Sequence, residues 1–353
     1  PPTAPPRPIR SMPEKATPAA LGFRLPAEWE PQAAVWLSWP HRRSTWPDRF
    51  AAIPPAFARL VTAISRFEDV HINAALRLQP RARRLCAEAG ADLARVTFHD
   101  HPTNDAWCRD HGPIFVKHRH TGEVALTDWR FNAWGGKYRP YDRDDAIPGC
   151  VARALGARRF SRDMVLEGGS IDGNGRGLLL TSEQCLLNPN RNPQLSRRDI
   201  EERLKVDLGL KEVLWLGVGL LNDHTDGHVD NLARFVAPGV LALPEPFGED
   251  DPNVAVFADA LARAKDWPVE IVTIPSAGLH LDEDGEAIPA SHMNFYIGNA
   301  TVVVPTYGGP SDAKAVAAVA KLFPDRETVG LPAAHILTGG GSFHCISQQV
   351  PRL

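Results

Sequence analysis

One cysteine, Cys345, lies in a sequence setting that suits a nucleophile. It follows the run GGGSFH, and polar residues such as Ser347 and Gln348 come directly after it. The three glycines allow a close approach of the backbone or a positive φ. A reactive cysteine needs a lowered pKa, or a cationic partner that holds it as the thiolate. The alternative is an inert buried thiol, which is what most cysteines are.

A histidine, His228, stands between two acids in the run HTDGHVDN. On a strand, residues i and i+2 point to the same face, so His228 and Asp230 could address one ligand. His224 and His228 also suggest zinc, but the intervening Thr-Asp-Gly breaks a helix and the H-E-x-x-H motif is absent. We therefore expect no metal here, and a histidine that only satisfies hydrogen bonds is the alternative.

Two further runs supply acids that could join these residues. NDAWCRDHGP brings Asp105, Trp107 and Asp110 together at the end of a strand, and LEGGSIDGNGRG places Glu167 before two glycines. Taken singly, acids in loops are usually solvated or cap turns. The second run lacks the Lys-Ser/Thr ending of a phosphate-binding loop, so we expect a glycine-rich β-turn over residues 172–177.

Together, one thiol, one histidine and three carboxylates would form an anionic pocket. Carboxylates bind guanidinium through paired charge-assisted hydrogen bonds, and two acids can hold both of its edges. The central carbon then faces a thiolate that the cation stabilises. The histidine can protonate the departing ammonia and activate water to hydrolyse the adduct. Peptide or ester hydrolysis would call for an oxyanion hole instead of paired acids. The pattern predicts a cysteine-dependent hydrolase of a guanidinium compound.

The elements that must position these residues recur along the chain. Apolar residues at i, i+3, i+4 and i+7 predict a helix over residues 57–64, followed by a strand over 70–76 and a hairpin over 112–129. Helices starting near residues 196, 253 and 311 lead to further strands, and hairpins turn at 238–239 and 298–299. The candidate residues Asp110, Glu167, His228, Asn294 and Cys345 are separated, by subtraction, by 57, 61, 66 and 51 residues.

This spacing suggests one supersecondary unit repeated around a central channel, with the polar tips facing that channel. An ordinary α/β sheet with functional loops at its strand ends is the alternative. We expect residues 21–353 to form a single domain. Residues 1–20 are rich in proline and lack the apolar core of a secretory signal, so we expect a disordered lead-in there.

Composition excludes several other classes of protein. The 353 residues carry a formal net charge of −3, which offers no basic surface for nucleic acid or anionic lipid. No run approaches the roughly 18 apolar residues of a membrane span. The five cysteines are widely spaced and odd in number, which disfavours a disulfide framework and favours a reducing cytoplasm.

At these residues the sequence resembles the agmatine deiminase family of the guanidino-group-modifying superfamily. The resemblance runs from Gly22 to Pro351 through LPAEWEPQAAVWLSWP, NDAWCRDHGP, WRFNAWGGKY, LEGGSIDGNG, DGHVDN, NFYIGN and GGGSFHCISQQ. It implies the superfamily's α/β fold, a five-bladed α/β-propeller (pentein) of strand-rich pseudo-repeats with helices outside. It also implies a homodimer, no metal or organic cofactor, and N-carbamoylputrescine as product on a route to putrescine.

The resemblance assigns a role to each candidate residue. Cys345 would be the nucleophile that forms an amidino-cysteine, and His228 the general acid/base. Asp110 and Asp230 would clamp the guanidinium, with Glu167 a further acid at the site. The loop before Cys345, including Gly340 and Gly341, would shape the pocket, and Trp107 would contact substrate. The distal amine of agmatine has three candidate partners by proximity: Asp105, Asp226 and Trp107.

Three positions depart from the family pattern: Cys108, His111 and the neighbourhood of His224, where acids are more usual. Because these positions lie beside the expected pocket, they bear on recognition of the part of the substrate away from the guanidinium more than on the chemistry at the guanidinium. Peptidyl-arginine deimination is therefore the nearest alternative function. A catalytically silent guanidinium-binding protein is the alternative outside enzymes.

Overall fold

The computed structural model describes residues 17–353, which form five small sheets of mixed strand direction. The first contains β1 (Phe23–Arg24), β5 (Ile114–His118), β6 (Val124–Arg130) and β7 (Arg158–Val165). The second contains β8 (Ile171–Gly173), β9 (Leu178–Ser182) and β10 (Glu212–Leu216), and the third β11 (Arg234–Ala237), β12 (Val240–Glu245) and β13 (Glu270–Pro275). The fourth contains β14 (Tyr296–Ile297), β15 (Thr301–Thr306) and β16 (Glu327–Pro332), and the fifth β17 (Ser347–Pro351), β2 (Gln32–Ser38), β3 (Asp69–Asn73) and β4 (Val96–His99).

Each sheet repeats one pairing pattern. Two strands pair antiparallel, and the second of them pairs parallel with a third strand. A parallel pair needs a crossover connection, which here carries helices. These helices are α1 (Ile53–Ser65), α4 (Ala133–Gly136), α5 (Asp142–Asp145), α6 (Ile147–Leu155), α7 (Glu183–Leu186), α8 (Arg197–Leu208), α9 (Val254–Ala264) and α10 (Asp312–Leu322). A further crossover carries α2 (Gln79–Glu88) between the parallel strands β3 and β4, and the remaining α-helices are α3 (Cys108–His111) and α11 (Ala334–Leu337).

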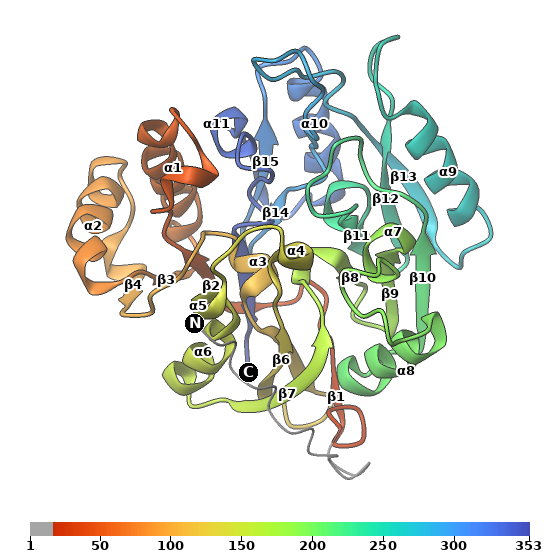
Figure 1. The fold of residues 1–353 in the computed structure, drawn as a ribbon, viewed down its shortest axis with the longest axis horizontal. Coiled ribbons are helices and arrows are strands. Elements are labelled where there is room, and N and C mark those ends of the chain that lie inside the picture. The colour runs from red at the N-terminus through yellow and green to blue at the C-terminus, as the bar shows by residue number, and fades with distance from the viewer. Residues whose placement is uncertain (1–16) are drawn as a thin grey trace.

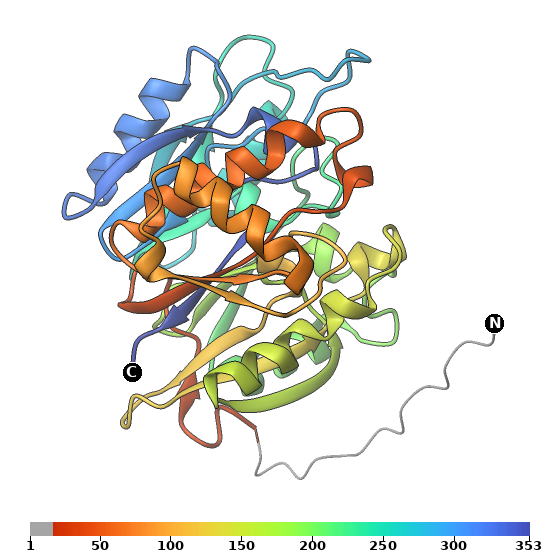
Figure 2. The same ribbon diagram turned by 90° about the vertical axis from the view of Figure 1, so that its left-hand side faces the viewer.

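The sheets follow one another around the molecule in Figure 1, with α1, α2, α6, α8, α9 and α10 at the periphery and the short α3 and α4 near the centre. Figure 2 shows α1 and α2 (orange) and α6 (yellow-green) covering one side. The fifth sheet joins distant parts of the chain, because β17 pairs antiparallel with β2. The apolar core lies between neighbouring sheets; for example, Leu214 of β10 and Leu241 of β12 pack with Phe257 of α9.

Local sequence signals explain where the helices begin and end. Ser196 and Asp199 form a reciprocal capping box that starts α8, and Gly209 ends it in the left-handed region with φ 67°. The predicted helices near 196, 253 and 311 are confirmed, as are the hairpin turns at 238–239 and 298–299. The turn predicted over 172–177 is confirmed as the β8–β9 connection, although β8 itself extends to Gly173.

Two expectations need adjustment. His228 and Asp230 do not lie on a strand, because residues 229–231 form a 3-10 turn that His228 precedes. The lead-in expected over residues 1–20 falls largely on residues 1–16, which lie outside the described range. Residues 17–20 form a turn in which the N–H of Ala19 donates to the carbonyl of Val206. None of the helices formed by residues 17–353 has the length and apolar character needed to cross a membrane.

A fully buried arginine, Arg234 at the start of β11, ties three sheets together near the centre. Its Nε donates to Asp172 of β8 at 2.5 Å, and its Nη2 donates to Glu28 before β2 at 2.5 Å. Its Nη1 donates to the carbonyl of Phe295 at 2.8 Å, next to β14. A guanidinium with this many fixed acceptors holds the inner ends of the sheets in register.

We expect Arg234→Met to lower the free energy of unfolding by about 3–5 kcal/mol, because it leaves the buried Asp172 carboxylate without a cation. Arg263→Met is the matched control: Arg263 pairs with Asp259 at the surface, and such pairs contribute about 1 kcal/mol or less. Urea unfolding followed by circular dichroism measures both. Equal effects of the two substitutions would show that the Arg234 network does not hold the sheets together.

Candidate functional site

A cavity of about 330 Å³ opens near the centre of the molecule and reaches Cys345. Its lining residues are Arg42, Ser44, Thr45, Asp105, Trp107, Asp110, Trp134, Tyr138, His224, Thr225, Thr338, Gly339, Gly340, Gly341 and Cys345. Segments from several sheets therefore meet at one site, which is what the recurring polar tips predicted. A Cβ added at Gly341 would lie 2.7 Å from Trp107 and 3.0 Å from the Cys345 Sγ, so glycine is required beside the thiol.

The Cys345 thiol is 2% exposed and is held by Asn294. Nδ2 of Asn294 donates to Sγ at 3.1 Å, and its Oδ1 accepts from the N–H of Cys345 at 3.2 Å. Arg109 holds the same segment, since its N–H donates to the Cys345 carbonyl at 3.0 Å. From the sequence, Asn294 was used only to mark the spacing of the repeated unit, and no role at the site was predicted for it. Its position at a polar tip equivalent to those of the candidate residues was the signal that could have indicated such a role.

Asp230 lies on one side of the thiol, with Oδ2 3.5 Å from Sγ. Its side chain is fully buried, and His344 contacts Oδ2 through Nδ1 at 2.7 Å. The other ring nitrogen of His344 contacts Glu28 at 2.6 Å. Burial acts to raise the pKa of Asp230, but the hydrogen bond and charge of His344 outweigh it and lower that pKa. Asp230 is thus held as a carboxylate. Sequence reasoning missed both His344 and Glu28.

Asp110, on α3, lines the cavity and is also buried. Its Oδ1 accepts from the N–H of Gly169 at 3.0 Å, and its Oδ2 accepts from Nε1 of Trp134 at 3.0 Å. Burial raises the pKa of Asp110 to about 6, and the nearby Asp230 acts in the same direction. A Cβ at Gly169 would lie 2.7 Å from Asp110 Oδ1 and 2.6 Å from His228 Nδ1. The glycines after Glu167 therefore do more than form a turn: Gly169 gives the acid and the imidazole room to approach each other.

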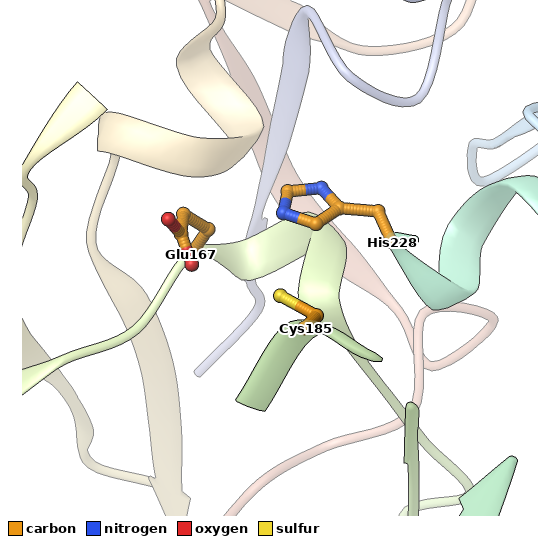
Figure 3. Close-up of side chains that lie close together, drawn as sticks. All are labelled: Glu167, Cys185 and His228. Atoms are coloured by element: carbon orange, nitrogen blue, oxygen red, sulfur yellow. The ribbon is translucent and has the colours of Figure 1, made fainter. Parts of the chain in front are cut away.

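His228 is fully buried, and its Nδ1 lies 3.6 Å from Oδ1 of Asp110. Burial alone would lower its pKa. The Asp110 charge, with those of Cys185 and Glu167, outweighs burial and raises the pKa well above its usual value. Figure 3 shows the Cys185 sulfur and the Glu167 carboxylate on the same side of the His228 ring. Both Asp110 and this second group of side chains therefore lie close to the imidazole.

Glu167 lies behind His228, and Arg191 fixes it. Nε of Arg191 donates to Oε1 of Glu167 at 2.7 Å, and both side chains are fully buried. Arg191 also donates to Asp226 at 2.6 Å and to the Thr225 carbonyl at 2.8 Å, which anchors the loop that carries His228. Sequence reasoning missed Arg191, because the run NPNRNP has no feature that marks a buried cation.

The remaining predicted residues divide between the cavity and its surroundings. Asp105 and His224 line the cavity, whereas the described lining residues do not include Asp226, Cys108 or His111. Asp226 is committed to Lys137 and Arg191. Cys108 and His111 are buried, and His111 shares a hydrogen bond of 2.8 Å with Ser38. Cys108 and His111, two of the three positions that depart from the family pattern, are therefore buried residues outside the cavity lining.

Electrostatics at the thiol are unfavourable for a free thiolate. Burial raises the pKa of Cys345 well above its usual value, and the charges of Asp230 and Asp110 raise it further. Oδ2 of Asp230 lies 3.5 Å from Sγ, and Asp110 lines the same cavity as Cys345. An entering cation would reverse this balance by neutralising the acids. The Cys345 thiol would therefore ionise more readily once a positively charged group enters the cavity.

Comparison with known proteins supports this description of the site. Residues 24–351 match the family described as Porphyromonas-type peptidyl-arginine deiminase, and the chain belongs to that family. The agmatine deiminase of Pseudomonas putida is 38% identical over 364 residues, covering 95% of this chain and 97% of that protein. The resemblance found from the motifs is thereby confirmed.

Solved structures agree. A structure described as agmatine deiminase of Enterococcus faecalis catalyzing its reaction matches with a TM-score of 0.88 and 36% identity, covering 95% of this chain and 98% of that one. A cysteine-to-serine variant of the C. jejuni agmatine deiminase with substrate bound matches with a TM-score of 0.86 and 30% identity, covering 94% of this chain and 96% of that one. The α/β architecture of mixed sheets is therefore shared with enzymes of this family.

We expect Asp230→Asn to speed alkylation of Cys345 by iodoacetamide at pH 8, because it removes a negative charge beside the thiol. A fall of one unit in the pKa of Cys345 gives about a tenfold faster rate below that pKa. Peptide mass spectrometry separates Cys345 from the other four cysteines, and Asp163→Asn at the surface is the control. An unchanged rate would mean that the Asp230 charge does not restrain the thiol.

Proposed function

We propose that the protein is an agmatine deiminase, which hydrolyses agmatine to N-carbamoylputrescine and ammonia. The observation that carries the proposal is the pair of acids at the thiol. Asp110 and Asp230 are ion-paired only to histidines among the described residues, and Oδ1 of Asp230 has no hydrogen-bond partner there. A planar cation with N–H groups on two edges fits between them. The deiminases at 38% and 36% identity add support.

In the first step, the guanidinium binds between Asp110 and Asp230 with its central carbon facing Cys345. Its charge lowers the pKa of the thiol, and the thiol proton leaves through the cavity to solvent. Sγ forms a bond to the carbon. His228, which its acidic neighbours keep protonated, donates a proton to one terminal nitrogen. The C–N bond breaks, ammonia leaves, and an amidino-cysteine remains.

In the second step, water takes the place of ammonia. His228 is now neutral and accepts a proton from the water as its oxygen attacks the amidino carbon. The C–S bond breaks, and Sγ recovers a proton as the ureido product leaves. Glu167, fixed by Arg191, keeps a negative charge close to the imidazole and so favours its protonated form in each cycle.

The central test is Cys345→Ala, which removes the nucleophile. We expect agmatine turnover to fall by at least about 10³-fold, because the covalent route is lost, while agmatine still binds in a calorimetric titration. Cys86→Ala, which removes a buried thiol far along the chain from the site, should keep full activity. If the parent protein releases no ammonia from agmatine yet binds it, the silent guanidinium-binding alternative replaces this proposal.

For the distal amine of agmatine we propose Asp105 as the partner. It is the acid that lines the cavity besides Asp110, and Thr45 and the N–H of Ala106 hold its two oxygens at 2.6 and 2.8 Å. Trp107, which also lines the cavity, would flank the methylene chain. Asp226 is excluded from this role by its pairing with Lys137 and Arg191.

We expect Asp105→Asn to raise KM for agmatine by about tenfold or more with little change in kcat, because a charged hydrogen bond to the amine contributes about 1.5–3 kcal/mol. Turnover of N-butylguanidine, which has no distal charge, should change far less. Steady-state ammonia release measures both. If kcat/KM fell equally for agmatine and N-butylguanidine, Asp105 would be needed for the folding of the site and not for binding the distal amine.

One observation favours peptidyl-arginine as a second candidate substrate. Arg42 lines the same cavity, with Nη1 4.0 Å from Oδ2 of Asp105. A guanidinium there disfavours a distal ammonium and favours carbonyl oxygens, such as those of a peptide backbone. The family description points the same way. Comparing kcat/KM for agmatine with that for an acetylated, amidated arginine separates the two candidates.

We also propose an architecture, a domain organisation and a cellular location for the protein. We infer that the five sheets are the blades of a five-bladed α/β-propeller, supported by their common strand order and by the β17–β2 pairing. Residues 21–353 are proposed to act as a single catalytic domain. A cytoplasmic location is supported by five free cysteines. The homodimer and the absence of a cofactor rest on family resemblance.

A further inference from the structure

A second group of reactive side chains includes His228 and lies outside the residues that line the cavity. A carboxylate oxygen of Glu167, the Sγ of Cys185 and a ring nitrogen of His228 all lie within 4.8 Å of one another, and all three side chains are buried. Figure 3 shows the three side chains lying close together. The hydrolysis proposed above uses His228 and Glu167 but leaves Cys185 without a task.

The types and spacing of these atoms suit a thiophilic divalent cation. Zn²⁺ takes thiolate sulfur, imidazole nitrogen and carboxylate oxygen at roughly 2.0–2.3 Å, which sets tetrahedral ligands roughly 3.3–3.8 Å apart. Ligand atoms that already lie within 4.8 Å of one another need to close by only about 1 Å to reach that geometry. Mixed sulfur, nitrogen and oxygen ligands favour Zn²⁺ or Co²⁺ over Mg²⁺ and Ca²⁺.

Unused polar atoms in the group also point to a ligand. Oε2 of Glu167 and both ring nitrogens of His228 are buried without a hydrogen-bond partner among the described residues. The opposite oxygen of Glu167 is held by Arg191 at 2.7 Å, so the carboxylate is fixed while Oε2 stays unused. Buried polar atoms without partners are uncommon and call for an explanation. A bound cation would satisfy Oε2 and one imidazole nitrogen at once.

The surrounding structure holds the three ligands on separate but rigid elements. Cys185 lies on α7, whose first turn is capped by Ser182. The Ser182 hydroxyl also donates to the Gly227 carbonyl at 2.5 Å, which ties α7 to the loop before His228. Thr225, which lines the cavity, accepts from the backbone N–H of His228 at 3.1 Å, so the group adjoins the cavity.

We propose that Cys185, His228 and Glu167 form an inhibitory zinc site. Binding forms bonds from the metal to Cys185 Sγ, one His228 nitrogen and Glu167 Oε2, with water as the fourth ligand. The Cys185 thiol proton and one proton of the His228 imidazolium are released to solvent, and no electron is transferred. The metal withdraws His228 from proton transfer, so the inhibition rests on the function proposed above, whereas the binding does not. Because the buried thiol must lose its proton, affinity rises with pH.

The test uses the full-length Cys345→Ala protein, in which the nucleophile cannot bind metal. Co²⁺ titration should give a saturable 1:1 thiolate-to-cobalt charge-transfer band, and Mg²⁺ should not compete. Adding Cys185→Ser should abolish the band and weaken binding by roughly tenfold or more. Adding Cys86→Ser, which changes a buried cysteine outside the group, should leave both unchanged. Circular dichroism checks that each variant folds.

The proposal is overturned if the band is absent from the Cys345→Ala protein or survives Cys185→Ser. Should Cys185→Ser not fold, Glu167→Gln takes its place, and unchanged Zn²⁺ affinity would count equally against the site. In the parent protein, micromolar Zn²⁺ should slow ammonia release from agmatine, and a chelator should restore it. A parent protein that does not turn over agmatine refutes the proposed function but leaves the cobalt measurement decisive for the site.

Discussion

Two carboxylates beside a buried thiol, Asp110 and Asp230, have no arginine partner among the described residues, and the rest of the site follows from that imbalance. The acids behind them are compensated: Glu167 by Arg191, and Asp172 by Arg234. Only the inner pair is left to histidines. Buried charge without a matched cation is costly, so the rigid frame around the site must hold the two acids in place. In the proposed reaction a guanidinium substrate supplies the missing charge and thereby lowers the pKa of the thiol.

The sequence predicted the repeated unit well because the unit is local. Amphipathic helices and hairpin turns depend on neighbouring residues, and they were found where the pattern indicated, including the helix that begins after Ser196. The pairing of β17 with β2 could not be predicted from the sequence, because it depends on how the sheets follow one another in space. His228 and Asp230 were predicted to share a strand face, yet a 3-10 turn presents them instead.

Residues that touch the reaction directly were predictable in type, whereas those that hold them were not. Cys345, Asp110 and Asp105 reach the cavity as expected from their motifs. Arg191 and His344 act through contacts across the fold that their own segments do not indicate, and the signal for Asn294 was its place at a recurring polar tip. Cys185 illustrates the same limit: its segment reads as an ordinary helix start, and only the folded chain brings its sulfur to His228.

The pairing of β17 with β2 also bears on how the protein is made. Ribosomal synthesis produces β2 early and β17 last of all the strands, so the open edge of β2, with its apolar run QAAVWLS, waits for its partner while the other sheets are made. Long waits of this kind slow folding and leave strand edges exposed to association with other chains. Because Cys345 lies just before β17, the nascent polypeptide lacks its proposed nucleophile until almost all of these strands have been made.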